Sequence, residues 1–111
     1  MRKIVKYIID NLPKVEPQGN HEDIEELEFV VENDNIFSQF KVEVQTLIDD
    51  LFLGDYSSPS EYTSRLIIQD PEIEFLLLNN KNFDITPHEW KELRKAIINH
   101  IDTHSYDDVQ N

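Results

Sequence analysis

The sequence has no cysteine, only two glycines and no long hydrophobic run. Without cysteine, the chain has neither a disulfide framework nor a thiolate zinc site. With glycine only at Gly19 and Gly54, it has no glycine-rich loop to cradle a phosphate. The N-terminal apolar run is cut by Lys6 and Asp10, so it is too short for a signal peptide or a membrane span. We therefore expect a soluble, cytoplasmic protein.

Basic residues are also scarce, and their distribution is uneven. The chain of 111 residues suits one domain, residues 1–111, and its 39% hydrophobic content is enough for a core. Lysine and arginine number 10 against 23 acidic residues, which gives a net charge of −13. Residues 1–14 carry +3, residues 15–80 carry −14 and residues 81–111 carry −2. This balance argues against direct binding of nucleic acid and favours a basic protein partner, with solubility alone as the alternative.

The N-terminal segment fits a short helix. Ile4, Ile8 and Leu12 recur four residues apart, which predicts a helix over residues 3–12, and the next residue is a proline that ends it. Basic residues at its start oppose the helix dipole, so a strand over the same residues is an open alternative. Residues 13–23, with two prolines and a glycine, are predicted to form a flexible loop.

Two stretches alternate apolar and polar residues, as half-buried strands do. Residues 24–33 are predicted to form a strand, followed by a turn of asparagine and aspartate at residues 33–35. Residues 37–53 are predicted to form a second strand, because the β-branched alternation is clean through Val44. The same residues place apolar side chains along one helical face, so a helix ending at Gly54 is the alternative.

The C-terminal half continues the strand pattern and then changes to a helix. Residues 54–64 are predicted to form a loop, residues 65–80 a strand region broken at Pro71, and residues 79–82 a turn. In the strand region, Ile73, Phe75 and Leu77 are predicted to share one face. A capping box and an N1 proline open the helix at Thr86, Pro87 and Glu89. Its buried stripe is Trp90, Leu93, Ile97 and Ile101.

Together these elements predict an α+β fold. We expect a small antiparallel sheet of three to five strands packed against the C-terminal helix, with an N-terminal helix at its edge. Residues 103–111 have little apolar surface and are predicted to form a frayed tail. The helix stripe supplies one wall of the predicted core, and the sheet supplies the other through Phe29, Val42, Val44, Ile73 and Phe75.

Residues 40–101 carry an ordered series of motifs that resembles a known type of protein. An alternating strand is followed by a Gly-Asp loop with proline, a strand introduced by Pro-Glu-Ile, an asparagine-rich turn, an Ile-Thr cap and a closing helix. This pattern resembles a recurrent type of small, mostly uncharacterised phage or mobile-element protein. The resemblance implies a phage context, the host cytoplasm as the location, and no catalytic residues.

Two groups of residues were considered as metal sites. Asp49 and Asp50, joined by Asp55 and Asp70 across a hairpin, could hold a hard cation, but no calcium-loop motif is present and a strand end reaching water is the alternative. His100 and His104 are four residues apart, so they could share a helix face with Asp107 or Asp108 as a third ligand. That spacing lacks the inner glutamate of a zinc protease.

Nucleophilic catalysis has no support in the sequence. The loop serines, Ser57, Ser58, Ser60 and Ser64, are not part of a nucleophile elbow. We therefore predict no catalytic residue, no metal and no cofactor, and the protein is not expected to be an enzyme. A metal-dependent enzyme is the second alternative.

The acidic residues are the remaining functional signal. Glu26 with Glu28, and Glu72 with Glu74, are spaced by two, so each pair projects from one side of a strand, about 6.7 Å apart. Duplex DNA carries one phosphate per roughly 3.4 Å of axis on each strand, so several elements would have to combine to imitate it. The predicted partner-binding residues are Glu22, Asp23, Glu25, Glu26, Glu28, Glu32, Asp34, Glu43, Asp55, Tyr56, Tyr62, Glu72 and Glu74.

These residues predict a non-enzymatic protein-binding module that acts as a nucleic-acid mimic. Its partner would be a basic, nucleic-acid-binding protein, and its sharpest form is an inhibitor of a host defence nuclease, as anti-CRISPR and anti-restriction proteins are. The first alternative is a homo-oligomeric structural or accessory phage protein, which would associate through an apolar face at Leu51, Leu53, Leu76 and Leu78.

Overall fold

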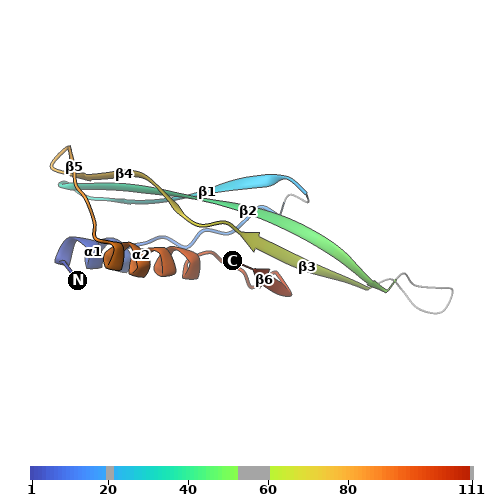
Figure 1. Cartoon of the computed structure of the whole chain (residues 1–111). Coiled ribbons are helices and arrows are strands. Elements are labelled where there is room, and N and C mark those ends of the chain that lie inside the picture. The colour runs from blue at the N-terminus through green and yellow to red at the C-terminus, as the bar shows by residue number, and fades with distance from the viewer. Residues whose placement is uncertain (20–21, 53–60, 111) are drawn as a thin grey trace.

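The computed structural model describes residues 1–19, 22–52 and 61–110 and confirms the α+β class. One mixed sheet and two helices form two layers (Figure 1). The elements in chain order are α1 (Lys3–Asp10), β1 (Ile24–Glu32), β2 (Ile36–Phe52), β3 (Glu61–Ile68), β4 (Glu72–Leu78), β5 (Lys81–Asn82), α2 (Pro87–Asn99) and β6 (Asp108–Gln110). The described residues thus contribute six strands, more than the three to five that were predicted, and one pair is parallel.

The long strand β2 is the centre of the sheet, which decides in favour of the strand interpretation of residues 37–53. β1 pairs with one edge of β2 in antiparallel fashion. β3 and β4 both pair with the other edge, and the break between them contains Pro71, where a strand was predicted to be interrupted. The outer edge of β4 carries β5, and the outer edge of β3 carries β6.

Both helices lie against the same face of the sheet (Figure 1). α2 begins with the predicted capping box: the Thr86 hydroxyl accepts a hydrogen bond from the backbone N–H of Glu89 at 3.1 Å. The predicted stripe of α2 packs inward, with Leu93 and Ile97 buried; Ile101, the last predicted member, is also buried but lies two residues beyond the end of the helix. The sheet contributes the buried pair Phe29 and Phe40, which lie directly opposite each other on β1 and β2, and Phe40 stacks on Trp90.

The helices cover only part of the sheet. β2 and β3 continue beyond them as a two-stranded ribbon (Figure 1), and the whole molecule is elongated, measuring 64 × 21 × 18 Å. Along β2, Thr46 is 5% exposed under the second layer, whereas Ile48, two residues further and on the same face, is 45% exposed. The ribbon therefore has no second layer at Ile48.

A β-bulge corrects the predicted faces of β4. The register shifts between Gln39 and Phe40, so that Glu74 is an extra residue on β4. Ile73 consequently lies opposite Phe40, whereas Phe75 lies opposite Gln39 on the other face. The prediction that both were core residues is wrong, since they are 42% and 48% exposed, and Leu76 is the buried residue of this strand.

Two segments that were predicted to be loosely held make specific contacts within their described parts. The tail was expected to fray, but β6 pairs in parallel with residues 65–67 of β3, and the Tyr106 hydroxyl hydrogen-bonds the Thr46 hydroxyl at 3.2 Å. Residues 13–23 were expected to be a flexible loop. Within their described part, Val15 is held to the chain beyond α2 by backbone hydrogen bonds with His100 and Asp102, at 3.0 and 2.8 Å.

Candidate functional site

The face of the sheet that points away from the helices, here called the open face, holds six of the thirteen predicted binding residues. Along β1 the burial alternates: Leu27, Phe29 and Val31 point to the helices, and the residues between them are exposed. The same alternation along β2 places its odd-numbered residues on the open face. Two carboxylates of β1 therefore share a surface with residues from the middle of β2 and the start of β4.

An acidic cluster occupies the middle of the open face. It consists of five carboxylates around one ammonium group: Glu26, Glu28, Glu43, Glu72 and Glu74 around Lys41. In the register, Glu28 and Glu72 flank Lys41 on either side, and Glu26 lies opposite Glu43. Because neighbouring strands are about 4.8 Å apart, these carboxylates are gathered more densely than any single strand allows.

Lys41 neutralises part of this cluster. Its Nζ lies 3.2 Å from a Glu26 oxygen and 3.4 Å from a Glu74 oxygen. The hydrogen bond to Glu26, and after it the one to Glu74, raises the pKa of Lys41 above its ordinary value. Within the described residues no base pairs with the other three members, so the cluster keeps a negative surplus.

An apolar strip adjoins the acidic cluster on the same face. It consists of Val30, Phe37, Phe75 and Leu77, and the rings of the two phenylalanines are 5.8 Å apart. This strip was not predicted from the sequence, because Phe75 was assigned to the core. The role of Lys41 as the counter-ion of the acidic cluster was not predicted either. The alternation of β2 places Lys41 on the polar face, but its acidic neighbours depend on strand order.

The remaining predicted binding residues are dispersed or lie outside the description. Glu25 points to the helix side, where it accepts a hydrogen bond from the backbone N–H of Gln18. Glu22 and Asp23 precede β1, and Asp34 lies in the turn after it. Glu32 is the last residue of β1 and lies on the open face beside the apolar strip. Asp55 and Tyr56 lie outside the described residues. Tyr62 is on β3, with its side chain outside the described part.

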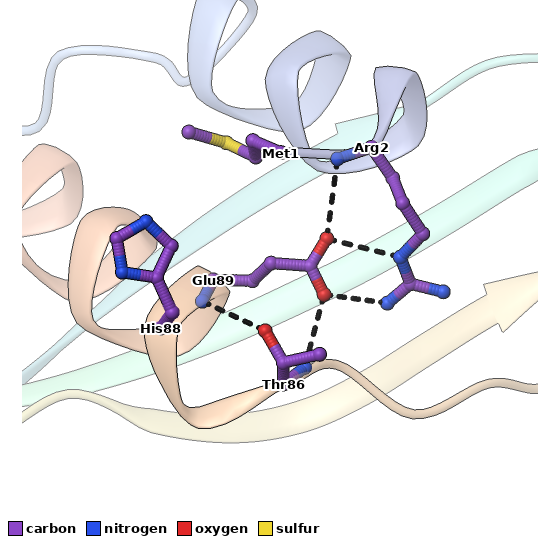
Figure 2. Close-up of a pocket in the computed structure, with 5 residues that line it drawn as sticks. All are labelled: Met1, Arg2, Thr86, His88 and Glu89. Carbon is purple, nitrogen blue, oxygen red and sulfur yellow. Dashed lines mark hydrogen bonds and ion pairs between the residues drawn. The ribbon is translucent and has the colours of Figure 1, made fainter.

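A second group of charged residues, Arg2 and Glu89, stabilises the fold. Glu89 is 3% exposed, and its carboxylate accepts hydrogen bonds from the Arg2 Nε and Nη2 at 2.9 and 2.7 Å and from the backbone N–H of Thr86 at 2.9 Å (Figure 2). These bonds, that from Arg2 first, hold the pKa of Glu89 well below its ordinary value. Since its oxygens are engaged, Glu89 joins α1 to α2 and is no candidate for proton transfer, although a shallow pocket lies beside it.

The histidine pair does not form the helix-face site that was considered as an alternative. α2 ends at Asn99, so His104 lies beyond the helix. His100 hydrogen-bonds the Ala96 carbonyl through Nδ1, and His104 bonds the Asp102 carboxylate, which raises the pKa of His104. Among the side chains that the structure describes, no three histidine or carboxylate groups gather as metal ligands would. The acidic residues Asp49 and Asp50 have side chains outside the described part, as does Asp55.

No helix in the described ranges has both the length and the apolar character needed to cross a membrane. We compared the chain with models of protein families, with curated proteins and with solved structures, and none of the three comparisons found a match.

Proposed function

We propose that the protein is a non-enzymatic protein-binding module whose open face binds a basic, nucleic-acid-binding protein. Its sharpest form is an inhibitor of a host defence nuclease, of the anti-CRISPR or anti-restriction kind, encoded by a phage or another mobile element. The observation that supports it is the acidic cluster, in which carboxylates from three strands surround Lys41.

Carboxylates can occupy the sites that a basic protein keeps for phosphates. Both groups accept paired hydrogen bonds from arginine, and both are attracted by lysine. Along one strand, like-facing carboxylates are about 6.7 Å apart, but neighbouring strands are only about 4.8 Å apart. A cluster that spans β1, β2 and β4 therefore comes closer to the charge density of a duplex than one strand could. The narrow, elongated form of the molecule suits a cleft made for nucleic acid.

The apolar strip supplies a second kind of contact beside these charges. Phe75 is nearly half exposed and lies next to the acidic cluster. Aromatic residues near the centre of an interface are typical anchors, and charged groups around them set orientation and the rate of encounter. A protein partner would use both halves of the open face, whereas nucleic acid would be repelled by the carboxylates.

Charge reversal of the acidic cluster tests this proposal. The immobilised protein is used to capture binding proteins from a host lysate, and a captured basic protein is then purified. Its affinity is expected to fall at least about tenfold between roughly 50 and 200 mM salt, because screening weakens exposed charge pairs. Duplex DNA should compete for the same partner. Binding should be lost in a variant with four reversals: Glu26→Lys, Glu28→Lys, Glu72→Lys and Glu74→Lys.

A matched variant controls for net charge. It carries the same number of reversals at acidic residues on the helix side or in the connecting segments: Asp10→Lys, Glu16→Lys, Asp84→Lys and Glu92→Lys. This variant should keep most of its affinity, since the open face is intact. Equal loss in both variants would reduce the effect to overall charge, and salt-independent binding would contradict the proposal.

The apolar strip favours a homo-oligomeric accessory protein as the second candidate. Of the face proposed from the sequence, Leu76 is buried and Leu78 is 37% exposed, while the side chains of residues 51 and 53 lie outside the described part. Phe75 is the exposed alternative. Under this candidate, light scattering would give a dimer or larger species that Phe75→Lys converts to a monomer. Under the main proposal the unmodified protein is a monomer.

A further inference from the structure

The outer edge of β1, on the side away from β2, is a second surface of interest. Asn33 donates its N–H to the Ile36 carbonyl at 2.8 Å, and the Val31 carbonyl accepts from the Ser38 hydroxyl. Both observations place the odd-numbered residues of β1 in the hydrogen-bonded pairs with β2. The N–H and C=O groups of the alternate residues therefore point away from the sheet: Ile24, Glu26, Glu28, Val30 and Glu32.

These outward groups form a long unpaired edge. Within residues 1–19, 22–52 and 61–110, no hydrogen bond joins the backbone of these five residues to another segment. β1 is nine residues long, whereas the strands at the other margins, β5 and β6, have two and three residues. An edge of this length is a template for a further strand.

The side chains of the edge residues specify the occupant. The five residues with outward backbone groups are the same five whose side chains lie on the open face. A strand added to β1 would place alternate side chains directly beside Glu26, Glu28 and Glu32, with an apolar neighbour at Val30. Opposite charges across a strand pair stabilise it, so the occupant should carry basic residues at alternate positions.

A second copy of the chain fits this edge poorly. β1 contains four glutamates and no basic residue. Antiparallel pairing of two β1 strands about Glu28 would place the two Glu28 carboxylates opposite each other, and like charges in that position destabilise the pair. Natural proteins use such charges to prevent the edge strands of two copies from pairing with each other.

We propose that β1 binds an extended basic segment of a partner protein by β-strand addition. This inference rests on the proposed function, for which it names the recognised element: a strand of alternating lysine or arginine with β-branched residues. Backbone hydrogen bonds hold the strand, and the carboxylates of the open face select its charge.

A synthetic peptide tests this directly on the full chain. The probe Lys-Thr-Val-Thr-Lys-Thr-Lys-Thr-Val, run antiparallel, places its lysines beside Glu32, Glu28 and Glu26 and its valines beside Val30 and Ile24. A control peptide of the same sequence is N-methylated at its third, fifth and seventh residues, which removes N–H donors toward β1 and leaves every charge in place. We expect N-methylation to weaken binding by at least roughly thirtyfold, since each backbone hydrogen bond contributes to the affinity.

Amide hydrogen exchange supplies an independent readout. In the free protein the amides of Glu26, Glu28 and Val30 should exchange fast, and those of Leu27 and Phe29 slowly. The unmodified peptide should slow the first group. Equal affinity of both peptides, or no protection of the outward amides, would overturn strand addition while leaving the acidic surface as the binding site. No binding of either peptide would also overturn it, and the charge-reversal experiment would then decide the proposed function separately.

Val30→Pro blocks the edge on the protein side. Proline removes one outward N–H without touching the ladder to β2, and edge strands tolerate it at such positions. The variant should lose most of its peptide affinity, whereas Val30→Ala, which keeps the N–H, should bind nearly as well as the unmodified protein. A Val30→Pro variant that is folded and binds the peptide normally would contradict the inference, and the methylated peptide decides the matter if the variant does not fold.

Discussion

Phe40→Ala is expected to lower the free energy of unfolding by about 3–5 kcal/mol, a large fraction of the stability of a typical domain. Phe40 is fully buried in the first third of β2. It lies opposite Phe29 on β1, and its ring stacks on Trp90 of α2 with 6.3 Å between the centroids. Removing the ring would leave a cavity at the point where the two layers meet, and surrounding side chains can fill such a cavity only in part.

Urea denaturation followed by circular dichroism measures this loss. The midpoint should fall by roughly 2 M, given a slope of about 1–3 kcal/mol per M for a domain of this size. Phe75→Ala is the matched control, because it removes the same ring from the open face, where the side chain is 48% exposed. Its cost should stay near 1 kcal/mol. Similar losses in the two variants would contradict the assignment of Phe40 to the core and Phe75 to the surface.

Glu89→Gln is expected to lower the melting temperature by roughly 10 °C at neutral pH. The carboxylate of Glu89 accepts from three groups of Arg2 and from the Thr86 N–H, with distances from 2.7 to 3.3 Å (Figure 2). An amide has one oxygen and an NH₂ group, so it would turn a donor toward donors and leave the Arg2 charge without its partner. Glu92→Gln, one turn further along α2, is the control and should change the melting temperature little, since Glu92 makes no hydrogen bond or ion pair with the residues that the structure describes.

The pH dependence of this effect follows from the lowered pKa of Glu89. A carboxyl group whose pKa is lower in the folded than in the unfolded state stabilises the fold above its ordinary pKa, about 4.3. That stabilisation is lost as the pH falls from there toward the folded-state value. The difference in melting temperature between the unmodified protein and Glu89→Gln should therefore be largest at neutral pH and shrink below about pH 4. A difference that does not change with pH would show that the loss is steric.

Features set by neighbouring residues could be predicted from the sequence. The start of α2 depends on Thr86, Pro87 and Glu89, which lie within one turn, and its cap was predicted correctly. The alternation of Leu27 and Phe29 with glutamates likewise identified β1 and its faces. Such signals need no knowledge of the rest of the chain.

Features set by distant residues could not be predicted in this way. Arg2 and Glu89 are 87 positions apart. The residues around Glu89 therefore predicted that it caps α2 but not that it pairs with Arg2. The bulge at Glu74 moved Phe75 out of the expected core, and no proline or glycine marks it. For the candidate site, the sequence indicated which carboxylates share a side of one strand. Only the pairing of β1 and β4 with opposite edges of β2 brings Glu28, Lys41 and Glu72 together.

The ribbon that β2 and β3 form beyond the helices makes the length of the molecule independent of the packing of its core. Past Thr46 the second layer ends, as the exposure of Ile48 indicates, so the length of this ribbon makes little difference to how the helices pack. Inserting two residues into each strand would preserve the alternation of the side chains between the two faces and leave the core register unchanged. The reach of the ribbon can therefore be engineered by such paired insertions while the core stays the same.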